Sequence, residues 1–140
     1  MAASRSVLAD FTKWLTAYGD AWEAGDAATA AALFTVGATV SPGPFDELLR
    51  GRRAIQAHLA EMFARVSGAS FAAQVLGAGD TYGVAHWRIA SPERAVDGVL
   101  VAALDCRGRC TSLRQWWHES GWRSRGCRPS STWPCLWRWP

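Results

Sequence analysis

The chain has 140 residues, 49% of them hydrophobic and 19% charged, which suits one domain with a real core and excludes a disordered chain. Its net charge of +3 arises in residues 121–140, which carry four arginines and no acidic residue, so the charge does not mark residues 1–120 as a nucleic-acid binder. No apolar stretch reaches the roughly 20 residues of a membrane span and no signal peptide is visible, so we expect a cytoplasmic protein that binds neither membrane nor nucleic acid.

Three helices are predicted in the first half of the chain. Apolar residues recur every three or four positions, as in amphipathic helices, in two stripes: Phe11, Trp14, Leu15, Tyr18 and Trp22, and then Ile55, His58, Leu59, Met62, Phe63 and Val66. Gly25 suits the C-terminal cap of the first helix and Asp26 the N-cap of the second. We therefore expect helices over 6–24, over 27–34 and after Gly51, with a short strand over 38–41.

After Ser67 the apolar residues alternate with a period of two, which indicates strands. Strands are expected near 70–76, 82–90, 98–105 and 110–117, separated by turn residues and paired as an antiparallel meander. Helices followed by strands favour an α+β fold.

Residues 121–140 follow no helical or strand period, although they contain four tryptophans. We interpret residues 1–120 as the domain and 121–140 as an irregular tail. A membrane or nucleic-acid surface built from the Trp and Arg side chains of the tail is the alternative.

Short motifs spread over residues 7–118 carry a family resemblance. In chain order they are W-x7-W-E-A-G-D ending at Asp26, A-L-F at 32–34, A-T-V at 38–40, G-R-R-A-I at 51–55, W-R at 87–88 and the run from Leu104 to His118. Their order resembles the nuclear transport factor 2-like superfamily, in its SnoaL-like branch with polyketide cyclases and, more distantly, ketosteroid isomerases. The resemblance implies a cone: a curved antiparallel sheet wrapped around three N-terminal helices, with a pocket at the open end and a homodimer formed through the outer sheet face.

Tyr18 and Asp105 are candidates for stabilising negative charge. By resemblance, Tyr18 stands where the isomerases place an oxyanion-binding tyrosine, and a buried phenol suits that role. Asp105 corresponds to a protonated aspartic acid of those enzymes. The alternatives are a core tyrosine bonded to backbone and an exposed aspartate that caps the Arg-Gly-Arg turn.

His58 is the candidate for moving a proton, because an imidazole on the apolar side of a helix can act as a general base. A buried structural histidine is the alternative. The catalytic base of the isomerases has no counterpart, because Pro42 stands at that position; Asp46 and Glu47 follow at the expected pocket rim. An Asp-Arg-Asp cluster of the kind used by epoxide hydrolases of this fold is not found.

The expected pocket wall is apolar and aromatic, which suits a flat hydrophobic small molecule. Its predicted residues are Trp14, Met62, Phe63, Trp87, Val101, Leu113, Gln115 and Trp117. His86 and Arg88 face away from this wall if Trp87 and Ile89 line it, and line it themselves if the register is shifted by one residue. Both registers remain open at this point.

No metal or cofactor is expected. The four cysteines do not form C-x2-C pairs and the three histidines lack metal-ligand spacing, and no Gly-rich phosphate loop occurs. The sequence therefore predicts a protein that binds an apolar small molecule, catalytic by proton transfer of the isomerase, cyclase or hydratase type. A non-catalytic ligand-binding or dimerisation module of the same fold is the alternative.

Overall fold

The computed structural model describes residues 6–92 and 94–120, so the predicted tail over 121–140 lies outside the described residues. The helices and strands follow in the order α1 (Val7–Ala24), α2 (Ala27–Ala31), β1 (Phe34–Ser41), β2 (Leu49–Arg50), α3 (Arg52–Arg65), β3 (Ser70–Ala78), β4 (Tyr82–Ala90), β5 (Ala95–Leu104) and β6 (Cys110–Ser120). This confirms the α+β class that the change of period predicts.

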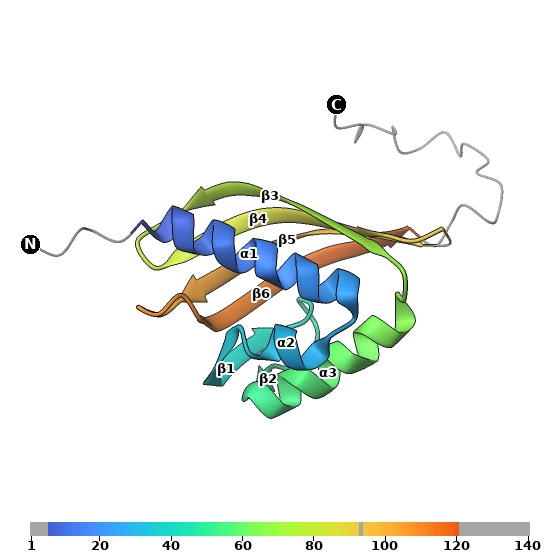
Figure 1. Ribbon diagram of the computed structural model, residues 1–140, viewed down its shortest axis with the longest axis horizontal. Helices are drawn as coiled ribbons and strands as arrows, with labels where there is room; N and C mark the ends of the chain where they lie inside the picture. The colour runs from blue at the N-terminus through green and yellow to red at the C-terminus, as the bar shows by residue number, and fades with distance from the viewer. Residues whose placement is uncertain (1–5, 93, 121–140) are drawn as a thin grey trace, which may run out of the picture.

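One six-stranded sheet, in the order β2-β1-β6-β5-β4-β3, forms the body of the molecule. Strands β3 to β6 make the predicted antiparallel meander, but β1 pairs with β6 in parallel, so the sheet is mixed. Figure 1 shows the long strands curving past α1, while α2 and α3 lie at the end of the sheet that holds β1 and β2.

The first helix forms where its caps and its apolar stripe predict it. The Ser6 hydroxyl accepts a hydrogen bond from the Ala9 amide, and Gly25 ends the helix with a left-handed φ of 66°, a conformation that glycine adopts without a steric cost. The stripe residues Phe11, Trp14 and Tyr18 are buried, and α1 packs on β3, β4 and β5.

The second helix is shorter than predicted, because the backbone around Leu33 and Phe34 has other partners. The Leu33 carbonyl accepts from the Trp14 indole at 3.0 Å and from the Cys110 amide at 2.8 Å. The Phe34 carbonyl accepts from the Arg52 guanidinium at 2.6 Å. These long-range contacts end the helix at Ala31 and begin β1 at Phe34.

Alternation along the strands separates the two faces of the sheet. On β4, Trp87 and Ile89 are buried at 5% exposure each, whereas Arg88 is exposed and His86 partly exposed. The inner face therefore carries Trp87. Of the two registers that the sequence allowed, the structure has the one in which His86 and Arg88 point outward.

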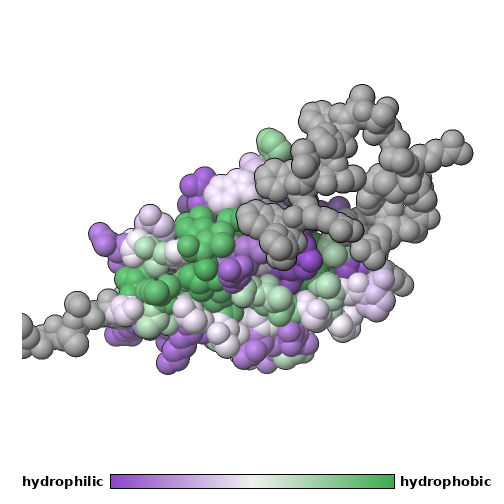
Figure 2. Space-filling model, turned by 90° about the horizontal axis from the view of Figure 1, so that it is seen from above, coloured by the Kyte–Doolittle hydropathy of each residue, from purple (hydrophilic) through white to green (hydrophobic). Residues whose placement is uncertain are grey.

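Apolar side chains also appear on the surface. Seen from above, they gather toward the end of the molecule where α1 begins (Figure 2), and Leu8 on α1 and Leu76 on β3 are about half exposed. No helix within the described ranges is long and apolar enough to cross a membrane.

Candidate functional site

A cavity of about 440 Å³ lies between the helices and the inner face of the sheet. Side chains from α1, α3, β1, β4, β5 and β6 line it, together with the segment between β1 and β2. The volume falls within the range of small-molecule sites. The interior of the domain is therefore open enough to hold a small molecule.

Tyr18 brings a phenol to this cavity from the middle of α1. Its ring stacks on Trp14 with centroids 4.8 Å apart, and the residue is only 2% exposed. Burial raises the pKa of the phenol well above its usual value, and the nearby Trp22 side chain offsets only part of that rise. Tyr18 therefore keeps its proton at any ordinary pH and is a hydrogen-bond donor rather than a base.

His58 reaches the same cavity from α3 and is half-buried. Burial lowers the pKa of its imidazole, while the carboxylates of Glu61 and Asp46 oppose that effect and Arg65 adds to it. The net pKa lies below the usual value for histidine. At neutral pH the imidazole is therefore neutral and has a lone pair that can accept a proton.

Charged side chains also line the cavity, and most of them are paired. Glu61 and Arg65 form an ion pair at 3.0 Å one turn apart on α3, and Arg94 pairs with Glu119 at 3.0 Å. Asp46 lies in the segment between β1 and β2. No group of three or more His, Cys, Asp or Glu side chains in the described ranges is arranged to hold a metal ion.

A long-range hydrogen bond connects the segment between β1 and β2 to β6. The Trp117 indole N–H donates to the Pro42 carbonyl at 2.7 Å. Within the segment, the Ser41 hydroxyl donates to the Gly43 carbonyl at 3.1 Å, and the Asp46 amide donates to that same carbonyl at 3.3 Å. Because Pro42 and Trp117 both line the cavity, this bond fixes part of its wall.

Trp117→Phe is expected to loosen that wall. The change removes the indole N–H and leaves the Pro42 carbonyl without this donor, so we expect a loss of about 1 kcal/mol of stability. Urea unfolding followed by circular dichroism measures it. Trp116→Phe, on the outer face of the same strand, is the control. Equal stability of the Trp117 variant and the wild type would show that the bond does not hold the segment.

Seven of the predicted site residues line the cavity: Tyr18, His58, Met62, Trp87, Leu113, Gln115 and Trp117. Trp14, Phe63 and Val101 do not, and the structure corrects their placement. Trp14 is buried with its N–H bonded to Leu33. Phe63 is buried against the Trp22 ring at 4.5 Å. Val101 lies on the outer face of β5, because its neighbours Leu100 and Ala102 take the inner one.

Asp105 also lies outside the cavity lining, in the turn between β5 and β6. Its Oδ1 accepts hydrogen bonds from the amides of Arg107 at 2.8 Å and Arg109 at 2.9 Å. Chiefly the bond from Arg109 holds the pKa of this carboxyl below its usual value. Asp105 is therefore an ionised turn cap, the alternative raised above, and the structure does not bring it to Tyr18 and His58.

Sequence reasoning missed several lining residues. Trp22 was recognised only as a stripe residue, although its place one turn after Tyr18 was a signal that both face the same space. Arg94 and Glu119 gave no signal, because their pairing depends on the register between β5 and β6.

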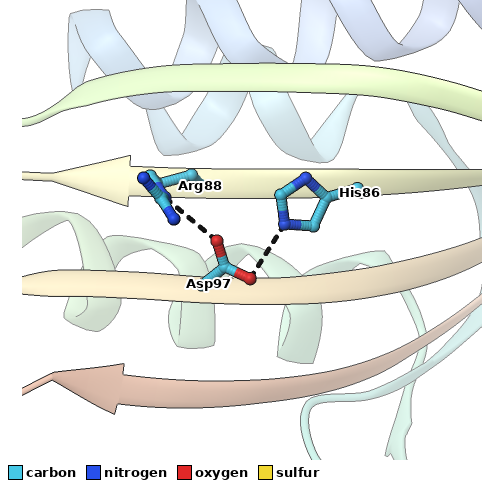
Figure 3. A network of polar contacts seen from close by, with 3 residues as sticks. All are labelled: His86, Arg88 and Asp97. Atoms are coloured by element: carbon cyan, nitrogen blue, oxygen red, sulfur yellow. Dashed lines mark hydrogen bonds and ion pairs between the residues drawn. The ribbon is translucent and has the colours of Figure 1, made fainter. Parts of the chain in front are cut away.

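Polar residues on the outer face form a network of their own. The Asp97 carboxylate on β5 contacts His86 Nε2 at 2.8 Å and Arg88 Nε at 2.9 Å, both on β4 (Figure 3). Burial alone would raise the pKa of Asp97, but these hydrogen bonds outweigh it and lower the pKa. The network lies across the sheet from the cavity. The homodimer predicted through this face stays a prediction.

Comparison with known proteins identifies a family to which the chain is similar and a solved structure with the same fold. The family model described as "SnoaL-like domain" matches residues 15–112, and no curated protein matches the chain significantly. Among the matching solved structures is one titled for the role of the epoxide hydrolase/cyclase-like enzyme SalBIII in pyran ring formation in polyether salinomycin. Its TM-score is 0.71 at 17% identity, covering 83% of this chain and 98% of that one. At this identity the match shows the fold alone.

Proposed function

Because the chain belongs to the SnoaL-like domain family of the nuclear transport factor 2-like superfamily, we propose that its cavity binds an apolar small molecule and transfers a proton on it. The observation that carries this proposal is that His58 and Tyr18 line one cavity. Burial favours the neutral form of each: the His58 imidazole can accept a proton, and the Tyr18 phenol keeps its proton and can donate a hydrogen bond. The reaction class is isomerisation, cyclisation or hydration.

In this mechanism His58 removes a proton from a carbon of the bound molecule. The electron pair of the broken C–H bond moves toward an oxygen, which gains negative charge, and the Tyr18 hydroxyl donates a hydrogen bond to that oxygen. The imidazolium that forms then returns the proton to another atom. The aromatic and aliphatic side chains of the lining lower the local dielectric below that of water, which strengthens both interactions.

The proposal is tested with 5-nitrobenzisoxazole, an apolar bicyclic molecule that reports proton abstraction from carbon. A base takes the ring C–H proton, the carbon–nitrogen bond becomes a nitrile, and the nitrogen–oxygen bond breaks to leave a coloured phenolate. We expect ring opening faster than in buffer, with saturation as substrate concentration rises. A rate linear in substrate and no higher than that of the same histidine concentration in free solution would overturn the proposal and favour a non-catalytic binding module.

Tyr18→Phe is expected to slow this ring opening, because the oxygen that becomes the phenolate loses its donor. Removing one such donor lowers the rate by about 10²- to 10³-fold in well-aligned sites. Phenylalanine preserves the ring that stacks on Trp14, so the fold should persist. Rates at saturating substrate measure the effect, and thermal unfolding of the variant is the control. An unchanged rate would assign Tyr18 to the core alone.

A further inference from the structure

Among the described strand residues that line the cavity, Gln115 on β6 is the one with an amide side chain. Its neighbours on the inner face are apolar. Leu113 precedes it on the strand at 1% exposure, and its cross-strand partner Leu100 is fully buried. The other inner-face positions of β4 and β5, from 85 to 89 and from 96 to 102, hold only apolar side chains or glycine. A glutamine at this place is therefore an exception to the pattern of the face.

The amide of Gln115 makes no hydrogen bond to any residue in the part of the chain that the structure describes. The residue is partly exposed. Its amide atoms are also not among the buried polar atoms that lack a partner, which in the described ranges are the indole nitrogens of Trp22 and Trp87. The amide is therefore unpaired but accessible, so a molecule that enters the cavity can reach it.

Packing alone gives no reason for a glutamine here. A methionine or leucine of similar size would gain more from burial on this apolar face, and it would bring no polar group that loses its bonds to water. Positions at which a side chain contradicts the local pattern, without a partner in the fold, are typical of functional sites. The unpaired amide therefore indicates a role in binding rather than in folding.

The chemistry of the amide limits what it can recognise. A glutamine side chain presents a carbonyl oxygen that accepts hydrogen bonds and an NH₂ group that donates them, both in one plane. A flat ligand in the cavity displaces water from this plane, and each half of the amide left without a partner then costs free energy. A ligand that satisfies both halves carries a donor directly beside an acceptor, as in the N–H and C=O of a lactam.

We propose that Gln115 is a specificity-determining residue, whose amide pairs with a neighbouring N–H and C=O of the ligand and so makes the cavity select apolar ring compounds with a lactam-type edge. The inference rests on the proposed function in that it requires the cavity to bind a ligand, and it deepens that function by naming the substrate class. Gln115 comes from β6, whereas Tyr18 and His58 come from α1 and α3. The contact that selects the ligand is therefore separate from the groups that move the proton.

The test compares 2-quinolinone with 1-methyl-2-quinolinone, two flat bicyclic lactams that differ in one respect. The first has an N–H beside its carbonyl, and in the second a methyl group replaces that hydrogen, so only the acceptor remains. We expect the wild type to bind 2-quinolinone about three- to tenfold more tightly, the effect of one net hydrogen bond. Nuclear magnetic resonance titration of ¹⁵N-labelled protein gives both dissociation constants, and the side-chain NH₂ signals of Gln115 should shift when 2-quinolinone binds.

Gln115→Met assigns the preference to its residue. Methionine keeps the length of the side chain and removes the amide, so the preference for 2-quinolinone should fall below about twofold. Urea unfolding should show stability equal to or above that of the wild type, because the apolar face then has no unpaired amide. Gln74→Met is the matched control, since Gln74 is exposed on the outer face of β3, and it should leave the preference unchanged. Comparing two probes within one variant cancels any general change in packing.

Equal affinity of the wild type for the two probes would overturn this inference. A preference that survives in Gln115→Met would also overturn it, because the size of the added methyl group would then be the cause. If neither probe binds to a protein that opens the ring of 5-nitrobenzisoxazole, this inference is wrong and the proposed function stands. If neither probe binds and ring opening is no faster than in buffer, both are wrong.

Discussion

His58→Ala is expected to lower the rate of 5-nitrobenzisoxazole ring opening by about 10²- to 10⁴-fold, the usual contribution of a positioned general base. The neutral imidazole of His58 has both the lone pair and the proton affinity that the step needs. Alanine leaves the walls of the cavity in place, so substrate binding should change less than turnover. Steady-state kinetics separates the two, because kcat falls while KM stays within a few-fold.

His86→Ala is the matched control for that experiment. It removes the same kind of side chain from the outer face of the sheet, where His86 contacts Asp97 rather than the cavity. Its rate should equal that of the wild type. Equal losses in the two variants would mean that the fold, and not a base at the cavity, was affected; no loss in either would remove His58 from the mechanism.

Gly98→Ala is expected to destabilise the domain by about 3 kcal/mol or more, at the upper end of what overpacking costs. A Cβ at this position would collide with the Trp116 carbonyl oxygen on the neighbouring strand, and would lie 2.8 Å from Trp117 Cβ and 2.9 Å from Trp87 Cζ2. Relief of these contacts requires β5 and β6 to separate, because two of the three atoms belong to backbone or Cβ positions. Urea unfolding followed by circular dichroism measures the loss.

Gly77→Ala, on β3, provides the comparison. A Cβ there would meet no atom within 4 Å, and alanine suits a strand better than glycine does, so stability should stay the same or rise by a few tenths of a kcal/mol. If both variants unfold at the same urea concentration, the close packing of Gly98 under Trp87 does not contribute to the stability of the sheet. Because Trp87 lines the cavity, Gly98→Ala should also weaken ligand binding.

The fold was predictable because local signals agreed with the final structure. The stripe that holds Tyr18 and the cap at Gly25 define α1, and the switch to a period of two after Ser67 defines the meander. What sequence did not predict depends on long-range pairing. The two residues of β2 form a strand only beside β1, and the parallel pairing of β1 with β6 joins segments about 75 residues apart.

Helix periodicity shows which side chains face inward, but not which of them reach the cavity. Tyr18, His58 and Met62 line the cavity, whereas Trp14 and Phe63 of the same stripes are buried outside the lining. On strands, alternation placed Trp87, Leu113, Gln115 and Trp117 at the cavity and failed for Val101, which faces outward. For Asp105 the site role came from the resemblance, whereas the alternative read from the Arg-Gly-Arg turn was the correct one, because its carboxylate accepts hydrogen bonds from two backbone amides of that turn.

The most direct test of the account is the pH dependence of wild-type ring opening between pH 4 and 9, with the rate in buffer subtracted. Because burial lowers the pKa of His58, the rate should rise with pH, reach half of its plateau below pH 6.5, where an exposed histidine is half-protonated, and then level off. It should then stay flat to pH 9, because the Tyr18 phenol keeps its proton. A rate that keeps rising in proportion to hydroxide, with the same profile in His58→Ala, would contradict the central claim that this cavity holds a working base.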